Sequence, residues 1–388
     1  MTKFRNLSQG RGYLAIPGPS VMPEAVLNAM HRPAPNIYAG ELVEMIPHLM
    51  EDLRRIAGTQ HHVAMYIGNG HAAWEASLSN VVAPGDKVLV PATGRFGIGW
   101  GDAATGLGAE VEVMDFGLQS AMDIDQIAER LEADTSTSVV NDIAGLRAAL
   151  DAADHPALLM VDCIASFACD RFEMDNWGVD VMVTACQKGL MVPPGVSFVF
   201  FNDRAAAVRE ALPRVSRFWD WTPRANPQEF FQYHCGTAPT HHIYGLRAAL
   251  DMIHDEGIEA VWDRHETLAR AVWAACDAWG SAGDLALNIA DPALRSHAVT
   301  ALRLKAPQAT ELRDWVEGNI GLTLGIGLGM APKDSPESHG FFRLGHMGHV
   351  NGQMVMGMLG GIEAGMSALD IKRGTGALEA AAKVIGGA

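Results

Sequence analysis

The sequence predicts an α/β protein with a mostly parallel sheet in a large domain, followed by a smaller α+β domain. Short apolar runs typical of buried strands alternate with helical periodicity up to residue 256. After residue 257 a long helix comes first, and strands then alternate with single helices. We therefore expect an irregular N-terminal arm at residues 1–20, a large domain at 21–256 and a small domain at 257–388.

Composition limits the possible functions. Of the 388 residues, 48% are hydrophobic, which is enough for a large core, and a net charge of −16 argues against nonspecific binding of nucleic acid. The start of the chain lacks the apolar region of a signal peptide, and no run of about 18 apolar residues predicts a membrane span. Five cysteines without metal-site spacing fit reduced thiols, so we expect a cytoplasmic protein.

The elements of the large domain follow from periodicity and from Gly and Pro breaks. In chain order we expect helices at 23–31 and 41–56, strands at 63–67, 87–91 and 110–114, helices at 124–133 and 143–153, strands at 157–162, 181–185 and 197–201, and helices ending near 211 and spanning 240–256. The small domain is expected to contain a helix at 258–280, a strand at 298–304, a helix at 310–318, a glycine-rich turn at 325–329, a strand from 341 and a helix at 351–368.

One strand of this pattern is absent. After the helix at 124–133 an apolar strand is due, but the chain runs directly into the polar stretch 135–138. About a dozen residues, a strand with its connection, are absent from the expected place. Either the fold tolerates a missing strand, which a closely packed sheet disfavours, or the sequence omits a segment. Thr135 at the start of this stretch either faces a site at the strand ends or belongs to a plain turn.

Lys188 and Asp162 are the main candidates for chemistry. Lys188 follows the apolar run 181–185, and Asp162 ends the apolar run 157–162. Both are therefore expected at the carboxyl edge of one sheet, where α/β proteins bind ligands. Pyridoxal phosphate (PLP) needs such a pair, because a lysine amine forms the Schiff base and an acid keeps the pyridine nitrogen protonated. The alternatives are a lysine that reaches solvent or simply pairs with the acid, and an acid that caps a turn.

Other motifs are weaker when taken singly. Asn69, Gly70 and His71 form a turn between a strand and a helix, which is suited to binding phosphate but also common elsewhere. Phe96 is placed either to stack on a flat ring or to fill the core. Arg343, in a glycine-flanked strand, is the best candidate for binding a substrate carboxylate, the alternative being a surface ion pair.

His346 and His349 follow the Arg343 strand at a spacing of three residues. On a segment that passes from strand to loop, this spacing does not bring two imidazoles onto one metal ion. We therefore expect no metal.

Together these motifs resemble the class V aminotransferases, which are fold-type I PLP enzymes, and within them the alanine/serine/aspartate–glyoxylate group. The resemblance covers nearly the whole chain. It is carried by the segments 68–76, 161–166, 187–189, 193–195, 237–239 and 343–346.

The resemblance implies a role for each matching position. Lys188 matches the Schiff-base lysine, and Asp162 matches the partner of the pyridine nitrogen. Phe96 matches the residue that stacks on the ring, and Thr135 matches a hydroxyl residue beside it. Arg343 matches the arginine that binds the substrate carboxylate.

The phosphate of PLP has its own matching positions. Asn69, Gly70, His71 and Gln187 match phosphate contacts within one subunit. Thr237 matches a residue that reaches the phosphate of the neighbouring subunit, which implies a homodimer with shared active sites.

The chain also departs from the family pattern. Cys186 stands where the family often has serine, and His234 stands where an aromatic residue is common. Residues 36–40 lack a His-Arg pattern, which bears on the substrate, and the absent strand bears on the position of Thr135.

The function expected from this resemblance is transfer of an amino group from aspartate, serine or alanine to glyoxylate. The alternatives are a PLP-dependent lyase, a pyridoxamine–pyruvate aminotransferase on the same scaffold, and a noncatalytic binding module that has kept the fold. An intact phosphate turn argues against free pyridoxamine as the substrate. The presence of Lys188, Asp162 and Arg343 together argues against the binding module.

Overall fold

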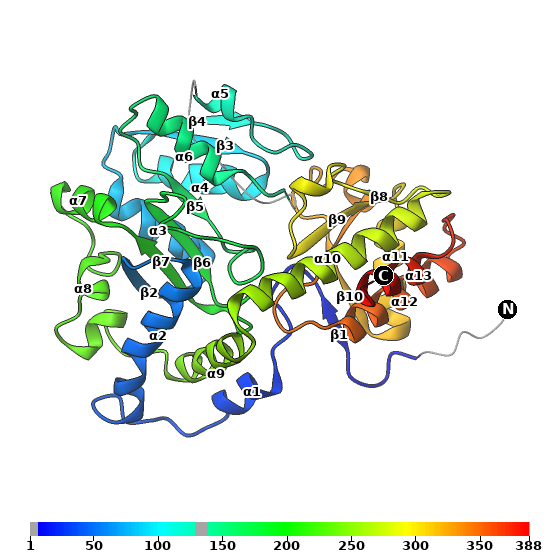
Figure 1. Cartoon of the computed structure of the whole chain (residues 1–388), viewed down its shortest axis with the longest axis horizontal. Coiled ribbons are helices and arrows are strands. Elements are labelled where there is room, and N and C mark those ends of the chain that lie inside the picture. Colours follow the sequence, from blue (N-terminus) through cyan, green and yellow to red (C-terminus); the bar gives the residue numbers. More distant parts are fainter. Residues whose placement is uncertain (1–6, 129–138, 388) are drawn as a thin grey trace.

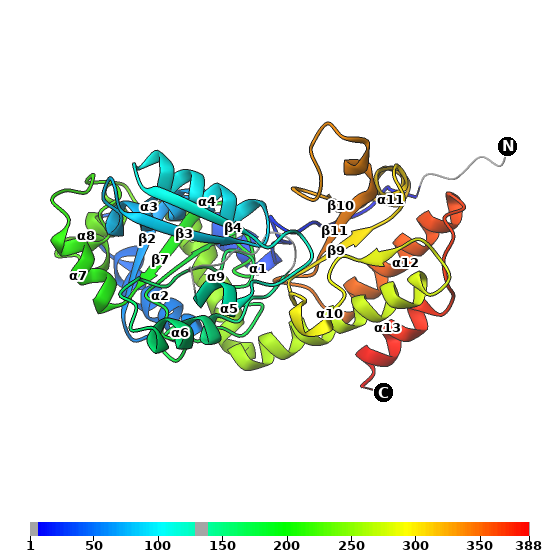
Figure 2. The same cartoon turned by 90° about the horizontal axis from the view of Figure 1, so that it is seen from above.

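The computed structural model describes residues 7–128 and 139–387, so the predicted site residue Thr135 lies outside the described residues. Two groups of strands stand apart and are linked by the long helix α10, Ile258–Gly280 (Figure 1). The second view shows α10 running from the first group towards α12 and α13 of the second (Figure 2). The expected mixed α/β architecture is confirmed.

A four-stranded sheet carries the predicted lysine and acid. Its order is β2-β7-β6-β5, and β5 and β6 are parallel while β7 is antiparallel to both of its neighbours. The strands are β2 (His62–Gly68), β5 (Met160–Asp162), β6 (Val181–Ala185) and β7 (Gly195–Phe201). Every residue of β6 is buried, because the strand is covered on both faces, and this explains its unbroken apolar run.

Two further parallel strands of this half pair only with each other among the described residues. They are β3 (Lys87–Ala92) and β4 (Glu110–Asp115). The strand between residues 157 and 162 is shorter than expected, because only its last three residues form β5. The missing strand stays a prediction, since the polar stretch that replaces it falls outside the described residues.

Helices cover the sheets of this half. They are α1 (Glu24–Met30), α2 (Glu41–Ala57), α3 (Gly70–Val81), α4 (Arg95–Gly106), α5 (Ile124–Ala128), α6 (Ile143–Ala152), α7 (Asp203–Ala211), α8 (Thr222–Ala225) and α9 (Thr240–Glu256), with the 3-10 turn η1 (Phe230–His234). The helix α4 was not predicted, because three of its first seven residues are glycine. Glycine is needed there for close packing: a Cβ on Gly101 would lie 3.2 Å from Val90 Cγ2.

The second half is built on a five-stranded sheet. Its order is β1-β10-β11-β9-β8, with β1 parallel to β10 and the other pairs antiparallel. The strands are β1 (Tyr13–Ala15), β8 (Ala286–Leu287), β9 (Val299–Arg303), β10 (Leu322–Ile326) and β11 (Phe341–Gly345). The helices are α10, α11 (Gln308–Ile320), α12 (Gly352–Ala368) and α13 (Ala377–Ile385), with the 3-10 turns η2 (Pro292–Leu294) and η3 (Pro336–Gly340).

Two sequence predictions for this half need correction. The N-terminal segment is not wholly irregular, because Tyr13–Ala15 forms the edge strand β1 beside β10. The stretch predicted as a turn at 325–329 begins inside β10, where Gly325 pairs with Arg343. Glycine suits this strand position because a Cβ there would lie 2.5 Å from Pro17 Cδ.

Each half has its own hydrophobic core. One cluster runs from Val26 to Val261, and the other combines Ala15 with residues between Leu268 and Ala381. Val261 of the first cluster lies beyond the predicted division at residues 256 and 257, and this boundary stays a prediction. Within the described residues, none of the helices combines the length and apolar character that a membrane span needs.

Candidate active site

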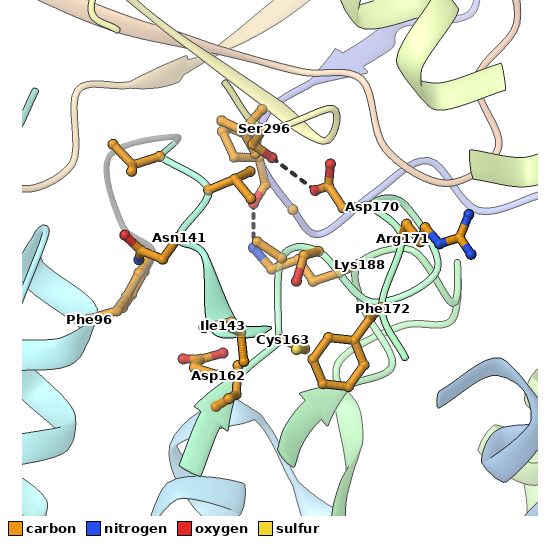
Figure 3. A pocket seen from close by; sticks show the side chains of 18 of the residues that line it. Phe96, Asn141, Ile143, Asp162, Cys163, Asp170, Arg171, Phe172, Lys188 and Ser296 are labelled. Carbon is orange, nitrogen blue, oxygen red and sulfur yellow. Dashed lines mark hydrogen bonds between the residues drawn. The ribbon is translucent and has the colours of Figure 1, made fainter. Parts of the chain in front are cut away.

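Lys188 lies in the turn between β6 and β7, directly after the buried end of β6. The prediction that a strand delivers this lysine to the sheet edge agrees with the structure. Its amine points into a cavity of about 240 Å³ that Phe96, Asp162 and Arg343 also line (Figure 3). The structure therefore brings together four of the predicted site residues.

The N-terminal segment wraps around this lysine. The Nζ atom of Lys188 donates a hydrogen bond to the carbonyl of Pro17. Ser20 donates twice to the lysine turn, from its amide to Gln187 O at 2.9 Å and from its hydroxyl to Lys188 O at 2.7 Å. A Cβ on Gly18 would lie 2.5 Å from Lys188 Cδ, so only glycine leaves room for the lysine side chain here.

Burial and charge adjust the basicity of this amine. Burial, together with the nearby charge of Arg343, lowers the pKa of Lys188 from 10.5 to about 8. Roughly a tenth of the amine is therefore neutral at pH 7. A neutral amine is the form that attacks a carbonyl carbon, so this environment favours covalent chemistry at Nζ.

Asp162 ends β5 and is 7% exposed. Its Oδ1 accepts the amide of Ile164 at 2.7 Å, and its Oδ2 accepts the indole N–H of Trp74 at 3.0 Å. Burial raises the pKa of Asp162, while these hydrogen bonds and the charges of Lys188 and His71 act in the opposite direction. A buried carboxylate is stabilised in its charged form by such hydrogen bonds and nearby positive charges.

The predicted phosphate turn begins α3. Asn69 caps this helix, and its side chain accepts the amide of His71 at 3.1 Å. The N-terminus of a 12-residue helix is a position suited to an anion, and the phosphate contact stays a prediction. Gly70 fits closely under Ile164, because a Cβ on it would lie 2.3 Å from Ile164 Cδ1.

Arg343 lies in the middle of β11, opposite Ala301 of β9. It is 9% exposed, and its Nε donates to Ile326 O at 2.7 Å. Among the described residues neither terminal nitrogen of Arg343 has a hydrogen-bond partner, so both remain available to a carboxylate. Burial lowers the pKa of Arg343 to about 10, and the guanidinium remains charged at neutral pH.

Five predicted cofactor contacts do not line this cavity. Asn69, His71 and Thr237 are exposed, and Gly70 is packed under Ile164. Gln187 also lies outside the lining, but its Oε1 is buried without a hydrogen-bond partner in the described part of the chain. The structure thus leaves the phosphate contacts as predictions.

The sequence analysis missed the contacts that Pro17, Gly18 and Ser20 make with Lys188. The only available signal was the run Ile16-Pro-Gly-Pro-Ser20, which was predicted to be irregular. It also missed Trp74, the donor to Asp162, since an aromatic in an amphipathic helix normally predicts core packing.

The two histidines after β11 do not form a metal site. His346 is fully buried, with Nδ1 2.9 Å from His297 O and Nε2 2.8 Å from Thr300 Oγ1, whereas His349 is exposed. Across residues 7–128 and 139–387, no three His, Cys, Asp or Glu side chains converge as metal ligands would.

Pyridoxal phosphate fits the residues present. The buried carboxylate of Asp162 suits a protonated pyridine nitrogen. Gln187 Oε1 is a buried acceptor without a hydrogen-bond donor among the described residues, so a bound group could supply one. The amine of Lys188, with its lowered pKa, suits an aldehyde. The fold and this site define a fold-type I PLP transferase.

A family model described as Aminotransferase class-V matches residues 13–328, and the chain belongs to this family. It is 32% identical to a serine–glyoxylate aminotransferase of Arabidopsis thaliana over 91% of this chain and 90% of that protein. It is 33% identical to an L-aspartate–glyoxylate aminotransferase of Paracoccus denitrificans over 93% of both chains.

Solved structures show the same fold. A ureidoglycine–glyoxylate aminotransferase from Bacillus subtilis superposes with a TM-score of 0.86 at 25% identity, covering 98% of this chain and 99% of that chain. A pyridoxamine–pyruvate aminotransferase from Mesorhizobium loti also has a TM-score of 0.86, at 23% identity and with 99% of both chains covered. The expected family and fold type are confirmed, and the protein is an aminotransferase.

Proposed function

We propose that the protein uses pyridoxal phosphate to transfer an amino group from a small amino acid, namely aspartate, serine or alanine, to glyoxylate. The observation that carries the proposal is the cavity in which the amine of Lys188, with a pKa of about 8, shares the lining with Arg343. The names of the Arabidopsis and Paracoccus relatives support glyoxylate as the amino acceptor.

The cofactor supplies an electron sink and a carrier for the amino group. Lys188 would hold it, and the Nζ amine would act as general base and acid for the proton at the substrate Cα. Asp162 stabilises positive charge at the pyridine nitrogen. Arg343 binds and orients the substrate carboxylate through its two terminal nitrogens.

The remaining contacts to the cofactor follow from the family resemblance. Phe96 stacks on the ring, where Trp74 supports it edge-on with the ring centroids 6.1 Å apart. The α3 N-terminus, from Asn69 to His71, and Gln187 hold the phosphate. The resemblance also implies a contact of Thr135 with the ring, but this residue lies outside the described residues.

We also propose a homodimer with shared sites. Thr237 is exposed on this chain, which suits a residue that reaches the phosphate of a neighbouring subunit. Ile67, next to the phosphate turn, and Phe231, six residues before Thr237, are exposed by 40% and 46%. Large apolar side chains at these positions favour burial against a second copy.

The test is the visible spectrum of the purified protein with PLP, recorded before and after single amino acids and then glyoxylate. We expect a yellow band that bleaches with aspartate or serine and returns with glyoxylate. Lys188→Met should abolish turnover and the sensitivity of the band to reduction by borohydride. Lys305→Met, which removes an exposed lysine, is the matched control and should behave as the native protein.

Other outcomes would point to the alternatives. A band that never bleaches with a common amino acid favours a lyase or another donor. Amination of pyruvate by free pyridoxamine would favour the pyridoxamine–pyruvate activity. No band after PLP is supplied would refute the assignment of Lys188 and favour a noncatalytic binding module.

A further inference from the structure

Asp170 connects the two halves of the molecule at the wall of the cavity. It lies in the loop between β5 and β6 and is 7% exposed. Its Oδ1 accepts the amide of His297 at 3.0 Å and lies 3.0 Å from His297 Nδ1. Its Oδ2 accepts the hydroxyl of Ser296 at 3.3 Å, a contact drawn beside Lys188 in Figure 3. One buried carboxylate of the four-stranded half thus binds three donors of the other half.

Ser296 and His297 lead directly into β9, which aligns the strand that carries Arg343. Ser296 Oγ also accepts the amide of Ala298 at 3.1 Å. Within β9, Val299 pairs with Gly345 of β11, and Ala301 pairs with Arg343. A change at Asp170 is therefore passed along a hydrogen-bonded ladder to the guanidinium that faces Lys188.

A second set of hydrogen bonds, made by His346, fixes the start of β9. His346 donates from Nδ1 to His297 O at 2.9 Å, and its Nε2 lies 2.8 Å from Thr300 Oγ1. The indole of Trp273 donates to the same Oγ1 at 3.1 Å, so the threonine hydroxyl donates to His346 Nε2. Burial lowers the pKa of His346 to about 4, and this side chain stays neutral in that tautomer. The contacts of Asp170 with Ser296 and His297 are therefore the ones in this network whose strength can change.

We infer that Asp170 is a positioning residue of the proposed transamination: by holding Ser296 and His297 it sets the separation of Arg343 from Lys188, and so the affinity of the site for a substrate carboxylate. The inference rests on the proposed function only for the identity of the substrate. Asp170 touches neither of the reacting groups and acts through β9 and β11.

The charge on His297 strengthens the link. Burial lowers its pKa, but the hydrogen bond and charge of Asp170, together with Glu266, hold the pKa above its usual value. Arg270 and Arg295 line the same surface hollow as His297, and His346 lies behind it. A protonated His297 makes a charge-assisted bond to Asp170, and this part of the link is lost as the pH rises through the pKa of His297.

The experiment compares Asp170→Asn, Ser296→Ala and His297→Gln with Asp334→Asn, an exposed aspartate that serves as control. In the holoenzyme, Asp170→Asn should weaken binding of acetate, an unreactive carboxylate, roughly 10-fold by calorimetry and should raise the KM of the amino donor to the same extent. The value of kcat and the visible band should change little. Ser296→Ala should give a smaller loss in the same direction.

The pH profile separates positioning from a structural role. In the native protein the acetate Kd should rise with pH, with an inflection at the pKa of His297, which lies above 6.5. In His297→Gln this inflection should disappear. The inference is overturned if acetate affinity in Asp170→Asn equals that of Asp334→Asn, or if His297→Gln keeps the inflection.

The two failures are distinguishable. Acetate binding is measured without turnover, so a protein that transaminates no donor still tests Asp170. Should Asp170→Asn not fold, His297→Gln alone decides, because it removes only a half-buried side chain and leaves the amide contact of residue 297 in place.

Discussion

Substitution of Gly18 by alanine tests whether the N-terminal segment shapes the lysine site. The Cβ of Gly18→Ala would lie 2.5 Å from Lys188 Cδ and 2.7 Å from both Cε and Nζ. Ordinary contacts between such atoms are about 3.5 Å or longer. Either the lysine side chain or residues 17–20 must therefore move by about 1 Å.

The size of the effect follows from that displacement. A misplacement of about 1 Å at a reacting group costs roughly 100-fold in rate, or about 2.7 kcal/mol of transition-state stabilisation. Gly18 also has a φ of +88°, where an alanine is strained by about 1–2 kcal/mol. The prediction is therefore a large loss of kcat together with a modest loss of stability.

A matched variant separates these two costs. Gly85 has a φ of +89°, and a Cβ on it would meet nothing within 4 Å. Gly85→Ala should show the same fall in the urea midpoint as Gly18→Ala but keep native kcat. Steady-state rates and urea unfolding of both variants make the comparison. If Gly18→Ala retains native kcat, or if Gly85→Ala loses as much activity, the reasoning about the lysine contact is wrong.

Three further predictions concern charged groups. Arg343→Lys should raise the KM of the amino donor roughly 10–100-fold without changing the cofactor band, because lysine cannot make a bidentate contact; an unchanged KM would refute its role. The pKa of Lys188 is about 8 in the fold and 10.5 in an unperturbed lysine, so at this residue the unfolded chain binds more protons between these values. The stability of the cofactor-free protein relative to Lys188→Met should therefore rise with pH there. The urea midpoints of the two proteins measure this difference, and parallel pH profiles would contradict the shift. Arg224→Met should lower the free energy of unfolding by about 3 kcal/mol. The fully buried Arg224 donates to the carbonyls of Met65 and Phe218, and methionine would leave both acceptors unpaired. Unchanged urea unfolding would contradict this.

The sequence predicted those parts of the fold in which periodicity and burial agree. The wholly buried strand β6 has an unbroken apolar run, and this placed Lys188 correctly. The helix α4 was missed because its glycines carry a packing requirement that depends on Val90, a residue of β3. The strand β1 was missed because three residues show no period, and its partner, Leu322–Ile326, lies some 300 residues away.

The residues of the candidate site also fall into two groups, those that a local sequence pattern predicts and those that depend on contacts with distant segments. Asp162 was predictable because a strand end places its side chain at the carboxyl edge of a sheet. Arg343 was singled out by the glycines around it, which allow close approach, although it lies in the middle of β11. Gly18 contacts Lys188 across 170 residues of sequence, and Asp170 contacts His297 across 127 residues. No local sequence pattern predicts such contacts. These residues follow only from the folded chain, since each acts through the space or the donors that it offers to a distant partner.

The site therefore depends on three segments that are remote in sequence. The four-stranded sheet supplies Lys188, β11 supplies Arg343, and the N-terminal segment lies against both. Gly345 shows how closely they meet, since a Cβ there would lie 1.9 Å from Ile16 O. The N-terminal segment is hydrogen-bonded to the lysine turn through Ser20 and to the five-stranded sheet through β1. Movement of either half would therefore distort this segment and its contacts with the other half. Removal of the N-terminal contact should consequently change lysine placement and substrate affinity together, whereas removal of the Asp170 link should change substrate affinity alone.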